Sequence, residues 1–586
     1  MIVRRLRRAA ALILVTGVAL ATSACGGTPL PASVMPGSLV DVAWPGALTT
    51  LNTATATGVT PGDRDVSAMT RSQFSRPVLG LPAEDASFGT AEIVAESDDA
   101  MTVVYDLAEP TWSDGIALDA ADLLLAWAAG AAHGDATEET AFDAAPSGLV
   151  HSSGVPSYDE FERRIEVTFD RPVIDWQTAL DVAVPAHVAG RIAFGLEDPM
   201  VAKQAVIDAI AGDDREALAN LATVWNGAFD ISAGTPPSDM ALLSSGPYRI
   251  DAVDGSADDG DQRVSLSANR EYTGGIPVSY EQIVLHQARG VDAIDAVGSD
   301  YDVVQLPAEA ADFEQVRDYE RDDFGMTTAD AGKMWALFAR VDSWPLDSRA
   351  ARTAFLSTVP RDAVAEASGE WKSAYTSTSA AVFSPDSDGY DIAVEDAGFE
   401  EAFAPADDPA AARKKAGVPE HTTVCILYDA DSEFARDAFD AIRKGVAEEG
   451  WIARDCGHPE PDEVVEVGGA YDAILTTVDV PRTPADIARQ WGDTAANLTG
   501  ATSSDRDELI EQLSRATDRY DARDLRVEIE RTIVDQRVVL PLAMDPSVIV
   551  ASRDIAPPSP ASGRAGALLT DPLTWAPVGA EPSVAP

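Results

Sequence analysis

The sequence predicts an α/β protein made of several domain-sized units. The chain has 586 residues, which at about 100 to 200 residues per domain corresponds to roughly three or four units. Its hydrophobic content of 46% supplies enough apolar side chains for large cores. Strand-like runs alternate with helical stretches in the first half, and a strand–helix–strand unit follows in the second.

The first 24 residues read as a secretory signal peptide. Arginines near Met1 precede an apolar run from Ala9 to Leu20, which is too short for the ~20 residues of a spanning helix. Small residues then lead to Cys25, as in a bacterial lipobox, which predicts lipidation of Cys25 and a lipid anchor on the extracytoplasmic face of the cell membrane. Thr22 stands where leucine is usual, so cleavage elsewhere is the alternative. We expect a flexible tether over residues 25–39 because Pro and Gly interrupt it.

The charge balance excludes one large class of function. The chain has 43 Lys and Arg residues against 97 Asp and Glu, which gives a formal net charge of -54. Such a surface repels phosphate backbones, and the basic stripe of a nucleic-acid-binding protein is missing. We therefore expect no nucleic-acid partner.

In the first half, periodicity and capping residues locate strands and a helix. Residues from Met101 to Leu107 alternate between apolar and mixed positions, as in a half-buried strand. Asp119 is a suitable N-cap, and Asp122 takes the third position of the helix that follows. Ile165 to Phe169 alternates again, which predicts another strand.

The second half contains a βαβ pattern with two cysteines. The apolar run Val424–Tyr428 predicts a strand covered on both faces, a helical stripe follows from Phe434 to Val446, and Trp451–Cys456 is the next strand. The two strands of such a unit are parallel and close in space. We expect Cys425 and Cys456 to form a disulfide in an exported protein, with two buried free thiols as the alternative.

The last part of the chain predicts further elements. One or two amphipathic helices lie between residues 505 and 536, and a strand covers residues 538–544. A Pro-rich segment closes the chain from Ala556 onward.

The residues that carry catalysis are missing from the sequence. The histidines are scattered, and the chain has no H-E-x-x-H, G-x-S-x-G, P-loop or G-x-G-x-x-G pattern. The acidic stretches Asp251–Asp261 and Asp386–Asp391 do not match the spacing of an EF-hand calcium loop. We predict that the protein is not an enzyme and needs no cofactor or metal.

One stretch carries a family resemblance. Val104–Trp127 reads VYDLAEPTWSDGIALDAADLLLAW. It resembles the W-S-D-G strand–turn–helix segment of the family 5 extracellular solute-binding proteins, the oligopeptide and dipeptide receptors of ABC importers. The matching residues are Trp112, Ser113, Asp114, Gly115, Asp122 and Trp127. A tight turn at Ser113–Gly115 beside a large hydrophobic side chain indicates a structural role for this motif.

Further motifs follow in the order of the family. Arg352 and its neighbours in Arg349–Val364 resemble the family's "RvRqAfslaiDRdaiv" helix, with Pro360 in place of the aspartate. The other similar segments are Leu48–Asn52, Val184–Val188, Ser245–Tyr248, Asn269–Gly275, Asp408–Val418, Val539–Met544 and Asp571–Trp575. Together they cover almost the whole mature chain.

The resemblance implies a two-lobed periplasmic-binding-protein-like fold of type II, cluster C, with an extra subdomain in lobe one. We place lobe one at residues 40–271 and lobe two at residues 272–536, with a return to lobe one and a C-terminal segment at residues 537–586. The ligand would lie between the lobes, which would close on it by a hinge motion.

The resemblance also implies a function and candidate contacts. A lipoprotein of this family captures peptides and delivers them to an ABC permease with separate ATPase subunits, and a monomer is expected. Asp479 stands near the family's ammonium-binding aspartate, while Thr50 and Asn52 would contact the ligand from lobe one. The alternatives are a non-peptide solute, such as a sugar oligomer or a metal chelate, and a degenerate member that acts as a sensor or surface-interaction protein.

Overall fold

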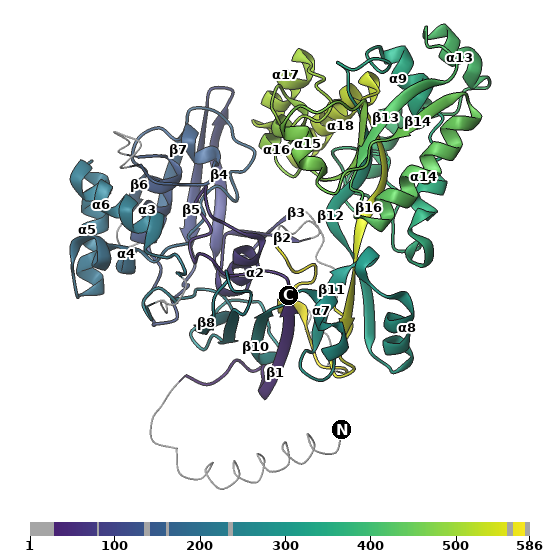
Figure 1. Cartoon of the computed structure of the whole chain (residues 1–586). Helices are drawn as coiled ribbons and strands as arrows, with labels where there is room; N and C mark the ends of the chain where they lie inside the picture. Colours follow the sequence, from purple (N-terminus) through teal and green to yellow (C-terminus); the bar gives the residue numbers. More distant parts are fainter. Residues whose placement is uncertain are drawn as a thin grey trace.

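The protein folds into two lobes that share one large sheet (Figure 1). The computed structural model describes residues 28–78, 81–133, 141–159, 163–232, 238–558 and 566–579, so the signal peptide and Cys25 lie outside the described residues. In the described ranges, no helix has the length and apolar character needed to cross a membrane.

The shared sheet has ten strands and passes through both lobes. In spatial order they are β14 (Trp451–Asp455), β13 (Thr422–Tyr428), β15 (Ala473–Asp479), β12 (Gly325–Ala339), β16 (Val539–Ala551), β11 (Val303–Pro307), β1 (Met35–Trp44), β10 (Tyr280–Gln287), β9 (Arg263–Ala268) and β8 (Tyr248–Asp254). The strands from β14 to β15 belong to lobe two and those from β11 to β8 to lobe one, so β12 and β16 connect the lobes.

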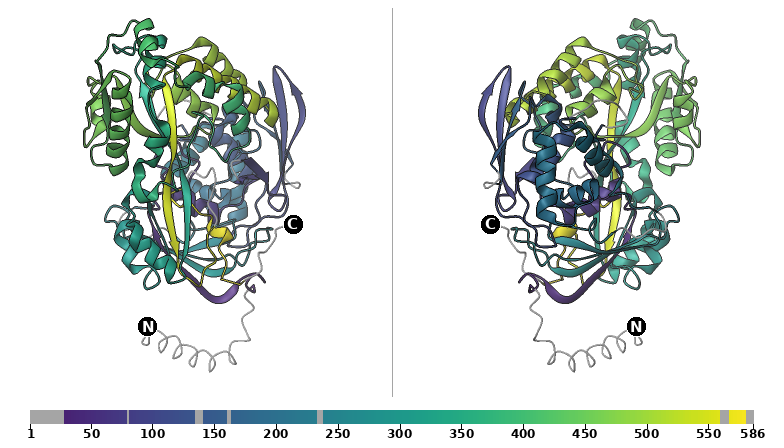
Figure 2. Two further views of the ribbon diagram at one scale, coloured as in Figure 1. Left: turned by 90° about the vertical axis from the view of Figure 1, so that its right-hand side faces the viewer. Right: turned by 90° about the vertical axis from the view of Figure 1, so that its left-hand side faces the viewer.

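The two connecting strands are the longest in the sheet and pair antiparallel along their length. Their register changes in the middle, where residues 331–333 of β12 stand opposite Asp545 alone. Gly332 lies in this irregular stretch with φ of 72°, a conformation that favours glycine. The side views show these two strands running side by side between the lobes (Figure 2).

Lobe one carries an additional sheet and most of the early helices. Its four-stranded subdomain sheet contains, in spatial order, β4 (Gly89–Ser97), β5 (Ala100–Leu107), β7 (Arg164–Phe169) and β6 (Ser157–Asp159), and a hairpin contains β2 (Ser75–Val78) and β3 (Leu81–Glu84). Its helices are α2 (Pro61–Thr70), α3 (Ala120–Gly130), α4 (Ala186–Phe194), α5 (Pro199–Ala211), α6 (Arg215–Gly227), α7 (Gly290–Ala293) and α8 (Phe313–Arg321).

Lobe two surrounds its part of the sheet with helices. They are α9 (Arg349–Leu356), α10 (Arg361–Ala365), α11 (Tyr390–Asp396), α12 (Phe399–Phe403), α13 (Pro409–Lys415), α14 (Glu433–Glu448), α15 (Pro461–Glu466), α16 (Pro484–Trp491), α17 (Ser504–Leu513) and α18 (Arg519–Gln536). Short 3₁₀ turns occur at η1 (Gly148–His151), η2 (Ile294–Ala296), η3 (Ala308–Ala310), η4 (Glu366–Trp371) and η5 (Pro572–Thr574).

Both faces of the lobe-two sheet are buried, which explains the continuous apolar run in β13. In β12, Trp335 and Leu337 pack into one core with the α14 residue Phe434. Met334 and Phe338 pack into the other core. Most of the lobe-one core forms a further cluster that includes the subdomain strands and α3, whereas β11 and α8 of lobe one contribute to the cluster of Trp335.

Several sequence predictions are confirmed. The predicted strand at Met101–Leu107 is β5, and α3 begins after its N-cap Asp119 with a complete capping box to Asp122. The βαβ unit is β13, α14 and β14, with the two strands parallel. The helical region 505–536 is divided into α17 and α18.

Three boundaries differ from the predictions. The segment 25–39 is not flexible throughout, because β1 begins at Met35 and Thr28 donates a hydrogen bond to Glu271. A lobe boundary at residue 271 is too early, because β10 pairs with both β9 and β1. The strand predicted at 538–544 continues to Ala551 through Asp545 and Pro546, a polar residue and a proline that normally end a strand.

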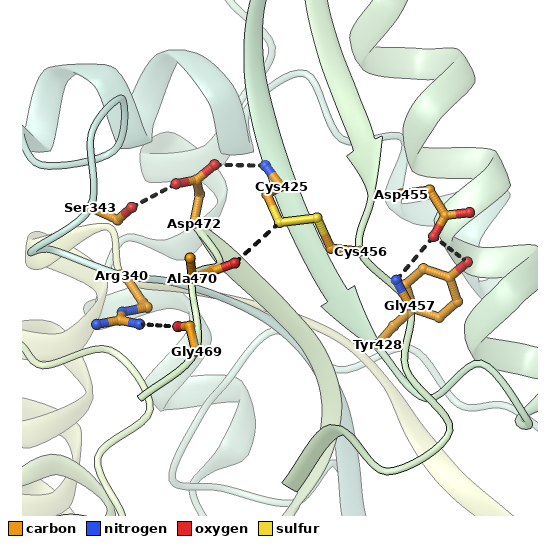
Figure 3. Close-up of a disulfide and its surroundings, with 10 residues drawn as sticks. All are labelled: Arg340, Ser343, Cys425, Tyr428, Asp455, Cys456, Gly457, Gly469, Ala470 and Asp472. Carbon is orange, nitrogen blue, oxygen red and sulfur yellow. Dashed lines mark hydrogen bonds between the residues drawn. A yellow bond between two sulfur atoms is a disulfide. The ribbon is translucent and has the colours of Figure 1, made fainter. Parts of the chain in front are cut away.

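Cys425 and Cys456 form a disulfide with a Cα–Cα distance of 5.7 Å, within the usual range (Figure 3). It ties the end of the edge strand β14 to β13. Asp472 supports the same place, since its carboxylate accepts hydrogen bonds from the Cys425 N–H at 2.7 Å and from the Ser343 hydroxyl at 2.6 Å. The disulfide therefore fixes the outer edge of the sheet.

Removal of the disulfide is expected to destabilise lobe two. The bond closes a sequence separation of 31 residues, for which the loss of unfolded-state constraint corresponds to about 4 kcal/mol. The double variant Cys425→Ser/Cys456→Ser, followed by urea denaturation, measures this loss. Unfolding of the reduced natural protein is the control and should show a similar loss. Equal stability of oxidised and reduced protein would contradict the prediction.

Candidate ligand-binding site between the lobes

The tryptophan of the W-S-D-G motif is buried inside lobe one, while Asp114 and Gly115 of its turn are exposed. Trp112 is fully buried, and its indole N–H donates to Asp122 at 3.2 Å. The Asp122 carboxylate also accepts from the Ala186 N–H at 2.9 Å and from the Lys203 ammonium at 3.0 Å. This carboxylate joins the motif to α3, α4 and α5, which is a structural role.

The turn of the motif is held by further internal bonds. Gly115 has φ of 83°, as expected for the predicted tight turn. The Ser113 hydroxyl accepts from the Ser244 N–H at 3.1 Å, and the buried His187 lies 3.0 Å from the Asp114 carboxylate. Burial favours a higher pKa for Asp114, but the hydrogen bonds from His187 and the backbone outweigh it and lower the pKa.

The two remaining motif residues also have internal partners. The Trp127 indole donates to the Ser152 hydroxyl at 2.9 Å. The Arg352 guanidinium donates to the backbone carbonyls of Gln536 and Leu346, each at 2.9 Å. Arg352 thereby connects α9 to the C-terminal end of α18.

Thr50 and Asn52 lie inside lobe one with internal partners. Asn52 is 1% exposed, and its side-chain amide donates to the Trp225 carbonyl at 2.9 Å. The Thr50 hydroxyl contacts the Phe229 carbonyl at 3.5 Å. These bonds hold the chain after β1 against α6 and the residues that follow it, and a ligand contact through either side chain stays a prediction.

Asp479 is exposed at the end of β15, directly opposite Lys333 of β12. Its backbone carbonyl accepts from the Gln490 amide at 2.7 Å, which fixes the chain between β15 and α16. The following loop carries Arg482. The guanidinium of Arg482 lies close to β12, since a Cβ added to Gly332 would be 3.0 Å from Nη2 of Arg482. Asp479 therefore lies beside the irregular part of β12.

Two carboxylates occupy this irregular part of the connecting strands. Asp330 accepts from the Gly332 N–H at 2.6 Å, and Asp545 of β16 accepts from the Trp335 indole at 3.0 Å. Burial, together with the charges of Asp386 and Asp545, raises the pKa of Asp330 to about 7. Burial and the charge of Glu309 raise the pKa of Asp545 to about 6. This irregular part of the connecting strands therefore contains two carboxyl groups whose pKa values are raised toward neutrality.

A lobe-one arginine lies within electrostatic range of this region. The pKa of Arg482 is lowered mainly by burial, and the charges of Asp479 and Asp486 partly offset this effect. The like charge of Arg64 on α2 lowers the pKa of Arg482 further. Arg64 belongs to lobe one and Arg482 to lobe two. Charged groups from both lobes therefore lie near the irregular part of β12 and β16, which we call the hinge region. The family motif singles out Asp479 as a candidate contact, which stays a prediction, whereas no local pattern marks Arg64, Asp330 or Arg482.

The described residues do not provide a metal centre. Among them, no group of three or more His, Cys, Asp or Glu side chains could hold a metal ion. Two small cavities, of about 10 Å³ and about 20 Å³, lie within the lobes, each with room for about one water molecule. Any larger solute must therefore be held elsewhere than in these two cavities.

The family model for bacterial extracellular solute-binding proteins, family 5, middle region, matches residues 86–450, more than half of the chain. The chain belongs to this family. Family 5 proteins are extracytoplasmic solute-binding proteins of ABC transporters, which agrees with the two-lobed fold. A comparison with curated proteins finds no match.

Solved structures of the same family share the fold. The periplasmic EDTA-binding protein EppA is 17% identical, with a TM-score of 0.72 over 95% of this chain and 99% of that chain. NikA from Brucella suis in complex with Fe(III)-EDTA is 13% identical, with a TM-score of 0.65 over 92% and 99% of the two chains. The oligopeptide-binding protein AppA from Bacillus subtilis, in complex with a nonapeptide, is 12% identical with a TM-score of 0.58 over 92% and 99%. Members with this fold therefore bind chemically different solutes.

Substitution of Asp122 should destabilise lobe one strongly. Burial opposes the charge of Lys203, whereas Asp122 and Asp119 stabilise it and raise its pKa. Asp122→Ala leaves this buried ammonium poorly compensated, so we expect a loss of about 3–5 kcal/mol in denaturant unfolding. Asp119→Ala removes an N-cap and a more exposed partner, and should cost only about 1 kcal/mol. An equal or smaller loss for Asp122→Ala would contradict this role.

Because the pKa of Asp330 is raised, we expect the stability of the folded protein to depend on pH. The folded pKa of Asp330 is about 7 and lies above the ordinary value of 3.8, so the folded state binds this proton more tightly than the unfolded chain. The contribution of Asp330 to stability is therefore present below about pH 4 and is lost as the pH rises toward about 7. Asp330→Asn should raise the melting temperature at pH 8 more than at pH 4.5, as measured by thermal unfolding. Asp300→Asn, at an exposed lobe-one position, is the control. A pH-independent effect of Asp330→Asn would contradict the prediction.

Proposed function

We propose that this family 5 protein is the binding component of a peptide importer and captures short peptides between its two lobes. The observation that carries the proposal is the chain path, which enters lobe two through β12 and leaves it through β16. Two adjacent strands with an irregular middle allow the lobes to rotate about one axis. A solute between them would be enclosed when they close.

The charged groups of the hinge region suit a peptide. A free peptide carries a terminal ammonium and a terminal carboxylate. Asp479 is exposed beside the hinge and can accept from the ammonium, while Arg64 and Arg482 supply guanidinium donors for the carboxylate. Peptide backbone groups would form the remaining bonds, as in strand addition.

A metal chelate or another anionic solute is the second candidate. The first of the similar structures described above is that of an EDTA-binding protein, and the second is a complex with Fe(III)-EDTA. The arginines of the hinge region come from both lobes, and a polycarboxylate chelate would be a suitable partner for them. The mass of the solute separates the two candidates.

The cellular setting belongs to the same proposal. The signal sequence and Cys25 support a lipoprotein on the extracytoplasmic face of the cell membrane. A monomer held there would pass its solute to an ABC permease whose ATPase subunits are separate chains.

Native mass spectrometry of the gently purified protein tests the proposal. We expect a ladder of short peptide masses that is released on unfolding and can be sequenced. A single non-peptide mass would favour the second candidate. Absence of binding to any solute, in this experiment and in a thermal-shift screen of peptides and chelates, would contradict a solute-binding function.

Asp479→Ala is expected to weaken peptide binding about tenfold, because it removes a charged hydrogen-bond acceptor for the ammonium. Isothermal titration with the recovered peptides measures this change. Asp493→Ala, at another exposed lobe-two aspartate, is the matched control. Unchanged affinity in Asp479→Ala would exclude Asp479 as the ammonium partner and leave the fold assignment intact.

A further inference from the structure

The lobe-one subdomain contacts lobe two at a place remote from the connecting strands (Figure 1). Arg171, just after β7, donates to the Glu511 carboxylate at 2.6 Å and to the Ser514 hydroxyl at 3.2 Å. The Ile174 N–H donates to the Ser514 carbonyl at 3.0 Å. Side-chain and backbone bonds therefore join the subdomain to the C-terminal end of α17.

Two further contacts enlarge this interface. The Thr517 hydroxyl donates to the carboxylate of Glu96, near the tip of β4, at 2.6 Å. Ile174 packs against the lobe-two core that includes Leu513. The interface thus combines three polar contact points with one apolar contact.

The charges at the interface favour its formation. Hydrogen bonds from Arg515, together with the charge and hydrogen bond of Arg171, lower the pKa of Glu511 despite some burial. Glu511 therefore remains an anion at neutral pH and can hold both guanidinium groups. The Arg171 side chain is 17% exposed, so its charge is already mostly withdrawn from water.

We propose that Glu96, Arg171, Ile174, Glu511, Ser514 and Thr517 form an interlobe latch that holds the lobes in the closed arrangement. The proposal rests on the proposed hinge function. These contacts can form only when the subdomain and α17 approach each other, so they stabilise the closed state and leave the open state unchanged. The subdomain then acts as the closing element of lobe one, and a solute leaves only after the latch breaks.

The expected strength of the latch depends on how far the side chains of its ion pair are exposed to water. The Glu511 side chain is 53% exposed, and a partly exposed ion pair contributes modestly and is screened by salt. The latch should therefore shift the balance between open and closed states about fivefold and should not lock the protein shut. Its contribution should decrease as the salt concentration rises.

Hydrogen exchange of the Ile174 amide measures the latch directly, because this amide donates across the interface. The full-length protein without added solute is compared with Arg171→Gln and with Glu511→Gln. We expect exchange at Ile174 to become about fivefold faster in each variant and no faster in the double variant. Arg249→Gln, which breaks an ion pair within β8 of lobe one, is the control and should leave Ile174 unchanged.

A cross-link provides a second test. The double substitution Ile174→Cys/Ser514→Cys should form a disulfide under mild oxidation, and solute release should then become slower than in the reduced form. Unchanged exchange at Ile174 in both glutamine variants, or failure of the cysteine pair to cross-link in a folded protein, would overturn the latch. Neither test needs a bound solute to detect the contact, so failure of the latch is separate from failure of solute binding.

Discussion

The antiparallel pairing of β12 and β16 is the constraint on which the rest of the structure depends. Each strand contributes to both lobes, so the ladder is at once the middle of the sheet and the covalent link between the lobes. Both halves are packed into large cores, and the register shifts near the middle of the ladder, between Asp330 and Met334 and again between Trp335 and Ala336. Rigid lobes with one irregular place between them are what a hinge motion requires.

The groups at this irregular place reduce stability for a physical reason. Asp330 and Asp545 are partly withdrawn from water, so their charged forms are disfavoured. A stretch selected for stability alone would carry apolar residues there, as the neighbouring residues Met334 and Trp335 do. Local departures from the stable pattern are typical of functional sites. The carboxylates and Arg482 at the hinge therefore agree with a role in binding or movement.

Local elements could be predicted because their signals are short-range. The N-cap Asp119 and the stripe that follows define α3, and apolar runs around one helical stripe define the unit from β13 to β14. The connecting strands were harder to predict. In β12, polar residues and Gly332 interrupt the apolar pattern, so the sequence does not indicate how long the strand is. In β16, Asp545 and Pro546 are residues that normally end a strand, but this strand continues to Ala551. The lobe boundary was placed too early for a similar reason, because only the pairing of β1 with β10 and β11 shows that the chain stays in lobe one after residue 271.

The candidate site was predictable only where a motif marked it. Asp479 follows a recognisable segment, whereas Arg64 and Arg482 come within electrostatic range of each other only through the fold of distant parts of the chain. The crystal structure of the protein with the solute that copurifies with it tests the account most directly. We predict a solute between the lobes, in contact with residues of both lobes and beside the irregular part of β12. A solute bound to the outer surface of a single lobe would contradict it.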